Sequence, residues 1–240
     1  MSPRTKEQNE EIRLRRLAQI RKAAADVFLN KGPLLEIRDV AVQAGLGYGT
    51  VYHYYSNKGN LLHDLLWDAL ERAGGWLEAP RASASVETPA GGNFGLAAEA
   101  DTGNSAAVDS QSSSRETTAS TELGPVAIAS IRLLQLWAED HALYLLHKLA
   151  GEGFASLPEA RSAPLSAAFR REVLAPLAAL LETGRAADGA AASDGNATEP
   201  PYRLQRAEML LAALVGCASL SLRRGKLHEE AKDIARFLKL

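Results

Sequence analysis

The sequence has a single cysteine, Cys217, few aromatic residues (6%) and no long apolar run. A lone cysteine excludes an internal disulfide and a cysteine-based zinc site. A membrane-spanning helix needs about 18 or more consecutive apolar residues, so none is expected. The first 30 residues are charged and lack the apolar segment of a secretion signal. We therefore expect a cytoplasmic protein without a membrane partner.

Neither sign of charge dominates, because 27 basic residues face 29 acidic ones, for a net charge of −2. The total therefore does not point to nucleic acid. The distribution is uneven, however. Residues 1–58 hold ten Lys or Arg and six Asp or Glu, whereas residues 79–122 hold two and six. The acidic segment hides a basic N-terminal region from the total.

Catalytic signatures are also missing. The chain has no Gly-x-Ser-x-Gly, no His-Glu-x-x-His, no P-loop and no Rossmann glycine pattern. His141 and His147 are six residues apart, so they point to different sides of one helix and cannot share a metal ion. We expect no enzyme activity, no cofactor and no metal.

What the chain does have is enough apolar surface for a folded core, with 46% hydrophobic residues. Residues 79–122 are the exception, because they are rich in Ala, Ser, Thr and Gly. Too little apolar surface is present there to offset the entropy of ordering, so we predict a flexible insertion. Residues 184–200 have a similar composition. The insertion separates an N-terminal domain, 13–72, from a C-terminal domain, 123–240.

The remaining segments have the period of amphipathic helices. Leu17, Ile20, Ala24 and Phe28 give one such stripe. No useful stretch alternates with period two, so the fold class is all-α. The helices are expected near residues 12–30, 59–77, 124–150, 164–183, 202–223 and 227–239.

Residues 36–55 carry the strongest local pattern. Ile37, Val40 and neighbouring alanines form one apolar face of a short helix, and Gly45 follows directly. Glycine suits the left-handed conformation that ends a helix. Val51 then anchors a second short helix. This order predicts a helix-turn-helix, whose second helix fits a major groove.

The stretch 44–61, AGLGYGTVYHYYSNKGNL, resembles the fingerprint of the tetracycline-repressor (TetR) family of bacterial regulators. The resemblance extends over about residues 13–72. It implies a three-helix DNA-binding domain joined to a C-terminal helical bundle for dimerisation and ligand binding. Three features depart from the family pattern: Leu35-Glu36 replaces the usual Ser or Thr cap, Gly47 replaces a common Ser, and Tyr48 replaces a common Lys or Arg.

The resemblance also implies which residues face DNA. The residues that open the second helix reach bases and phosphates in the family, and others contact phosphates: Gly47, Tyr48, Gly49, Thr50, Tyr52, His53 and Lys58. The alternative to a role at the DNA is that the tyrosines of this stretch are packing residues: Tyr52, Tyr54 and Tyr55. Basic residues near the N-terminus either add non-specific attraction to the duplex or form a solvated helix face: Arg4, Lys6, Arg13, Arg15 and Arg16.

Apolar stripes on the last two predicted helices resemble the dimer interface of the family. The stripe residues expected there are Leu211, Leu214, Ala218, Ile234 and Leu238. The alternative is that these residues pack within one chain. A two-fold dimer matches a palindromic operator of double-stranded DNA.

A small-molecule site is implied in the middle of the C-terminal domain. Trp137, His141 and Tyr144 lie on one face of the predicted helix 124–150 and are candidate ligand contacts. The alternative is that they are core aromatics with satisfied polar groups. The sequence thus predicts a homodimeric transcriptional regulator, a repressor released by a small-molecule effector. A constitutive DNA-binding repressor and a helical sensor or enzyme scaffold are the alternatives.

Overall fold

The computed structural model describes residues 5–74, 76, 123–187 and 200–240. All regular structure in these ranges is helical, which confirms the predicted fold class. None of the helices in these ranges is long and apolar enough to cross a membrane. The predicted insertion, 79–122, lies outside the described residues.

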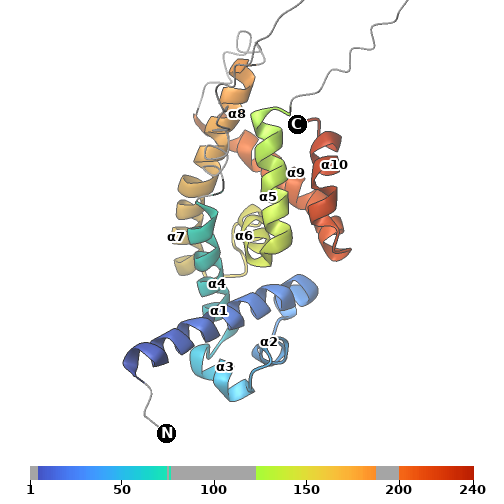
Figure 1. Ribbon diagram of the computed structural model, residues 1–240. Coiled ribbons are helices and arrows are strands. Elements are labelled where there is room, and N and C mark those ends of the chain that lie inside the picture. Colours follow the sequence, from blue (N-terminus) through green and yellow to red (C-terminus); the bar gives the residue numbers. More distant parts are fainter. Residues whose placement is uncertain (1–4, 75, 77–122, 188–199) are drawn as a thin grey trace, which may run out of the picture. The chain divides into compact units, whose positions relative to one another are not determined.

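The N-terminal part consists of α1 (Lys6–Lys31), a 3₁₀ turn η1 (Gly32–Leu34), α2 (Ile37–Ala44), α3 (Tyr48–Tyr54) and α4 (Lys58–Ala73). α1 packs against α2 and α4, and α2 packs against α3 (Figure 1). The apolar stripes predicted from the sequence meet in one core. Fully buried members of this core are Ile20, Val40, Val51, Leu61 and Leu66.

The turn between α2 and α3 is the predicted helix-turn-helix. Gly45 ends α2 with a φ of +64°, the left-handed conformation that only glycine adopts without strain. The Nε2 of Gln19 donates a 2.6 Å hydrogen bond to the carbonyl of Ala44, the last residue of α2. α1 therefore holds the turn that positions α3.

The start of α2 is capped although Leu35-Glu36 replaces the usual Ser or Thr. Asp39, inside the first turn, accepts a 3.2 Å hydrogen bond from the backbone N–H of Glu36. The Nζ of Lys31 donates to the same carboxylate at 2.6 Å, and this bond lowers the pKa of Asp39 below its usual value. The cap is supplied by an acidic side chain that α1 holds in place.

The predicted single helix over 124–150 is wrong, because the structure divides it into α5 (Pro125–Glu139) and α6 (His141–Gly151). Asp140 between them has extended backbone angles, φ −127° and ψ 97°. Its Oδ1 accepts a 2.9 Å hydrogen bond from the N–H of Ala142 and so caps the new helix. Hydrophobic period alone does not detect such a break.

The predicted helix 164–183 lies within a longer helical segment. α7 (Glu159–Phe169) continues through a π-helical turn, η3 (Arg170–Leu174), into α8 (Ala175–Ala187). α9 (Pro200–Arg223) lies against α6 and α8, and α10 (Leu227–Phe237) lies against α5. Figure 1 shows α10 beside α5 in the C-terminal part.

The stripes predicted as a dimer interface are buried inside the single chain. Leu211, Leu214 and Ala218 have at most 5% of their surface exposed, Ile234 has 8%, and Leu238 is half-buried. Side chains that already pack against neighbouring helices leave little surface for a second copy. This placement favours the intramolecular alternative for these residues and moves any dimer interface to another face of α9.

Candidate nucleic-acid interface and cavity

α3 presents its polar and aromatic side chains away from the core. Val51 is fully buried, whereas 51% of Tyr48 and 49% of Tyr52 are exposed, and His53 is exposed as well. The rings of Tyr48 and Tyr52 stack, with centroids 5.6 Å apart and planes 30° from parallel. The exposed face of α3 therefore carries an ordered aromatic pair. Thr50 is half-buried beside it.

The two glycines around Tyr48 are not required by the fold. A Cβ at Gly49 would meet no other atom within 4 Å, and one at Gly47 would make only an ordinary contact with Thr50 at 3.7 Å. Neither has a positive φ. What the glycines provide is exposed backbone, which a bulky partner can approach closely.

Lys58, predicted to contact phosphate, is exposed at the start of α4. Its Nζ donates a 2.9 Å hydrogen bond to the carbonyl of Pro33 in η1. Asn57 caps α4 by accepting a 2.9 Å hydrogen bond from the N–H of Asn60. An ammonium has three N–H donors, so Lys58 ties η1 to α4 and keeps two donors for another acceptor.

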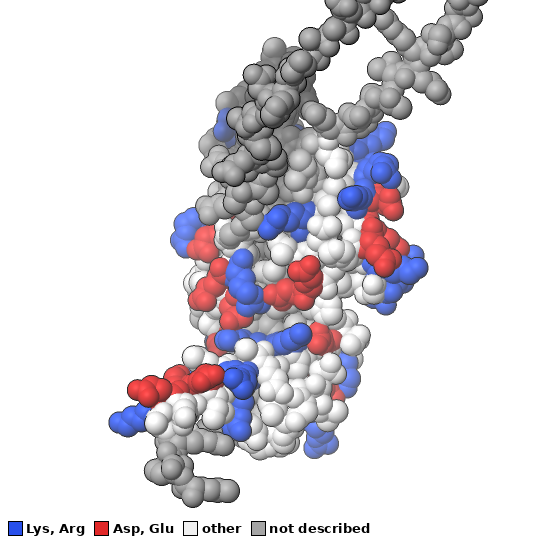
Figure 2. Space-filling view, viewed as in Figure 1, with Lys and Arg blue, Asp and Glu red and all other residues white. Residues whose placement is uncertain are grey.

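Two of the basic residues of α1 that were expected to attract DNA form ion pairs instead. Arg13 pairs with Glu10 at 2.9 Å, and Arg15 pairs with Glu11 at 3.0 Å. Figure 2 shows positive and negative side chains close together along α1. Such exposed pairs reduce the attraction of α1 for a polyanion. Arg4 lies outside the described residues.

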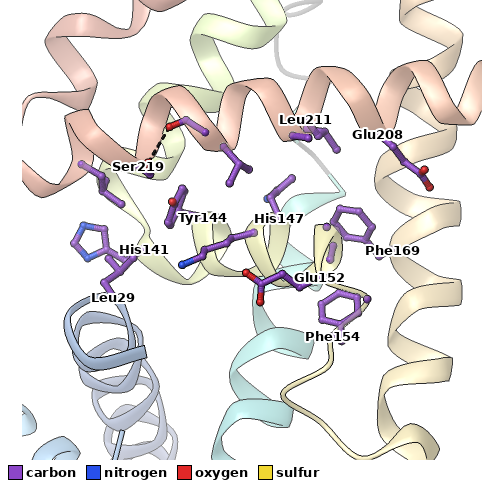
Figure 3. Close-up of a pocket in the computed structure, with 18 of the residues that line it drawn as sticks. Leu29, His141, Tyr144, His147, Glu152, Phe154, Phe169, Glu208, Leu211 and Ser219 are labelled. Atoms are coloured by element: carbon purple, nitrogen blue, oxygen red, sulfur yellow. Dashed lines mark hydrogen bonds between the residues drawn. The ribbon is translucent and has the colours of Figure 1, made fainter. Parts of the chain in front are cut away.

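A cavity of about 1260 Å³ lies among helices of both halves of the chain. His141 and Tyr144 of α6 line it, as predicted for ligand contacts, and Figure 3 shows both side chains at its wall. Trp137 does not line it, because this residue is fully buried in α5 and belongs to the core. Asp26 and Leu29 of α1 and Gln43 of α2 also face the cavity.

His147 is a cavity residue that sequence reasoning did not select. Its Nδ1 lies 2.7 Å from the carbonyl of Leu143 and 3.2 Å from the Nε1 of Trp137. One nitrogen cannot donate to the carbonyl and accept from the indole at once, and the shorter contact favours an Nδ1–H that donates to Leu143. The buried Nε2 then has no partner among the described residues. Burial lowers the pKa of His147 to about 4, so the ring is neutral near pH 7.

One contact joins α1 to α6 at the edge of this cavity. His141 Nδ1 lies 2.6 Å from Asp26 Oδ1, and both residues line the cavity. Neither the pairing nor its partner was visible in the sequence, because 115 positions separate the two residues.

Further ion pairs join α1 and α6 through α4. Asp68 of α4 pairs with Arg21 of α1 at 3.0 Å and with Arg72 of its own helix. Arg72 also pairs at 2.8 Å with Asp140, the cap of α6. A row of ion pairs therefore runs from Arg21 of α1 through α4 to Asp140 at the start of α6, and the separate Asp26–His141 contact also joins α1 to α6.

Comparison with known proteins agrees with this arrangement. Residues 20–65 match the family described as bacterial regulatory proteins, tetR family. No curated protein matches the sequence.

Solved structures of similar fold span nearly the whole chain. The fatty acid degradation regulator FadR from Bacillus halodurans is 18% identical, with a TM-score of 0.50 over 92% of this chain and 96% of that one. The transcriptional regulator FadR from Bacillus subtilis, in complex with stearoyl-CoA, has the same values. A tetR-family regulatory protein from Rhodococcus RHA1 is 16% identical, with a TM-score of 0.52 over 93% of each chain.

The family match falls on α1 to α4, where the helix-turn-helix lies, and the solved relatives extend the same fold through the C-terminal helices. Residues 20–65 thus form a domain of the family described as bacterial regulatory proteins, tetR family, within a fold that solved transcriptional regulators share.

Proposed function

We propose that this regulator is a homodimeric repressor that binds a palindromic operator and leaves it when a small molecule enters the cavity. The observation that carries the proposal is that both halves of the chain wall the cavity. Asp26 and Leu29 of α1 and Gln43 of α2 face the same space as residues of α6 and α9. A ligand there contacts the helices that hold α3, so it can bias their position.

The operator contacts are assigned to α3 and the start of α4. Tyr48 and Tyr52 offer hydroxyls for base edges or phosphates and ring faces for thymine methyl groups. Gly47 and Gly49 let the backbone come close, and Thr50 and His53 extend the same surface. The two remaining donors of Lys58 suit a phosphate.

The dimer interface is assigned to the outward faces of α8 and α9. Met209 and Leu220 of α9 each have 65% of their surface exposed, with the smaller, half-buried Ala213 and Cys217 between them. Their spacing of three or four residues places them on one side of the helix. α8, which packs against α9, adds exposed small residues, Ala175, Pro176 and Ala179. Small residues let helices of two copies approach closely.

The outward face of α10 is unsuited to this role. It exposes Lys232, Asp233 and Arg236, and Figure 2 shows charges of both signs on this part of the surface. Charged residues are depleted from the centres of protein interfaces because their desolvation is costly. The apolar face formed by α8 and α9 is the better partner surface for a second copy.

Effector binding is supported by the cavity and by a protein of similar fold. The cavity volume of about 1260 Å³ is ample for an organic molecule. The Bacillus subtilis FadR was solved with stearoyl-CoA bound. We assign the effector to this cavity, with His141 and Tyr144 among its contacts.

Selection of bound duplexes from a random DNA pool by the full-length protein tests the proposal. The expected result is a palindrome with half-sites about 34–36 Å apart, or a multiple of that spacing. Its affinity should fall steeply as salt is raised. No salt-sensitive affinity for any duplex would contradict operator binding. A small-molecule library that never changes operator affinity would favour the constitutive repressor instead.

A further inference from the structure

α6 presents a row of polar side chains to the cavity. His141, Tyr144 and Lys148 are spaced by three and four residues, so they lie along one face of the helix, and all three line the cavity. Figure 3 shows Leu29 of α1 next to His141 at one end. The row therefore begins where the cavity meets α1.

Lys148 is the charge in this row that lacks a counterion. It is half-buried, and within the described ranges no carboxylate lies in ion-pair contact with its ammonium. Asp26, which also lines the cavity, is already in contact with His141, with 2.6 Å between Oδ1 and Nδ1. The other acidic lining residues, Glu152 and Glu208, are exposed to solvent. A partly desolvated ammonium without a counterion favours the arrival of an anion.

The charged neighbours of Tyr144 also favour an anion. Burial raises the pKa of the Tyr144 hydroxyl. The positive charge of Arg223 has the next largest effect and lowers this pKa, and the negative charge of Glu152 raises it by less. The hydroxyl is thus under a net positive influence from its charged neighbours. It lies one helical turn from Lys148, so one carboxylate can accept hydrogen bonds from both side chains.

The far part of the cavity is apolar. Phe154, Phe169 and Leu211 line it, and Figure 3 shows both phenylalanines on the side away from His141 and Leu29. The rings of Phe154 and Phe169 pack edge to face with centroids 6.2 Å apart, and the neutral ring of His147 packs against Phe169 at 5.5 Å. This part suits a hydrocarbon or aromatic body.

We propose that the effector is an organic monoanion, a carboxylate joined to an apolar body, with its head on Lys148 and Tyr144. This inference rests on the proposed function, since it names the ligand class of the same cavity. The head lies near the Asp26–His141 pair because His141 belongs to the same row. A carboxylate there repels the carboxylate of Asp26, so its binding weakens the contact that joins α1 to α6.

Two matched ligand series test the charge of the head. Decanoate, decanol and decylamine share one body, and 4-phenylbutyrate, 4-phenylbutanol and 4-phenylbutylamine share another. Calorimetry with the full-length dimer should show at least one carboxylate binding about tenfold or more tighter than its alcohol, the effect of one charge-assisted hydrogen bond. The amines should bind more weakly still.

Variants then test the residue. Lys148→Met keeps the apolar stem and should abolish the preference for the carboxylate over the alcohol, whereas Lys148→Arg should retain it. Lys232→Met removes an exposed lysine of α10 and should bind like the wild type. The bound carboxylate should also weaken binding to the selected operator, in the wild type but not in Lys148→Met.

The inference is overturned if neither series prefers the carboxylate, or if no member binds at concentrations up to about 1 mM. It is also overturned if Lys148→Met keeps the preference. Operator binding is measured separately without any ligand. If operator binding fails, the proposed function fails; if it holds while the carboxylate preference is missing, only the ligand class is wrong.

Discussion

Tyr48 stands where similar regulators commonly have Lys or Arg, and it is stacked on Tyr52 at the exposed face of α3. Tyr48→Ala should reduce discrimination between the selected operator and base-substituted duplexes by about 1–3 kcal/mol, the usual worth of a base contact. Lys58→Ala should instead weaken binding to all duplexes alike and lower the salt slope by about one per protomer. Titrations of both variants at several salt concentrations distinguish the two roles. Wild-type behaviour in both would show that the surface is misassigned.

His147 makes the stability of the fold depend on pH. Its folded pKa is about 4 and its ordinary value is 6.5, so in this window the unfolded chain binds a proton that the folded chain excludes. Stability therefore falls as the pH drops from about 7 toward 4, by about 3 kcal/mol. Urea unfolding at about pH 7 and about pH 4.5 measures the fall.

The matched variant for that experiment is His147→Phe, which keeps an aromatic ring but cannot titrate. It should lose most of the acid-side decrease, while His228→Gln, which changes an exposed histidine of α10, should keep it. An equal decrease in all three proteins would mean that carboxylates and not His147 set the acid response.

For single residues, the sequence predicts whether a side chain is exposed better than it predicts which side chains it contacts. Tyr48 lies between two glycines, where no apolar helical period requires its burial, and the structure has its side chain exposed. The cavity position of His147 was not predictable, because its neighbours Trp137 and Phe169 come from α5 and α7. Trp137 and Tyr144 look alike in the sequence, yet a break between them gives one to the core and the other to the cavity.

Among the elements, the start of α6 depends on the side chain of Asp140, and the stability that it contributes can be measured. Asp140→Ala removes the cap of α6 and the partner of Arg72 together. We expect a loss of about 1–2 kcal/mol in the free energy of unfolding. Asp233→Ala, which removes only an exposed pair with Arg236 on α10, should change stability by less than about 0.5 kcal/mol. Chemical denaturation of the two variants gives the comparison, and equal losses would refute a capping role.

The stripes of apolar residues predicted most helices, because a period of 3.6 residues indicates a helix face that must be buried. The stripes do not indicate which element covers that face. Leu211 and Leu214 have the pattern of an interface, but α9 turns them toward its own chain. The helical break after α5 was missed for a related reason, since one capping carboxylate outweighed an unbroken apolar stripe over 124–150.

For the molecule as a whole, dimer formation is predicted to depend on Leu220 and not on Leu214. Leu220→Arg places a charge on an exposed position of α9 and should give a folded monomer that has lost operator binding, because one half-site contributes too little affinity. Leu214→Arg buries a charge and should destabilise the fold by several kcal/mol. Light scattering with circular dichroism distinguishes these outcomes. A dimeric Leu220→Arg would place the interface elsewhere.

α1 is a single rod of 26 residues that contacts the cavity near Asp26 and holds the turn before α3 through Gln19. From Asp26 to Gln19 the helix is about 10 Å long. A tilt of about 10° at Asp26 would therefore displace Gln19, and the turn that it holds, by about 2 Å. Hydrogen bonds to bases tolerate errors of only about 0.5 Å. Under the proposed function, a ligand that tilts α1 by a small angle at Asp26 would move the turn before α3 by more than the operator contacts tolerate.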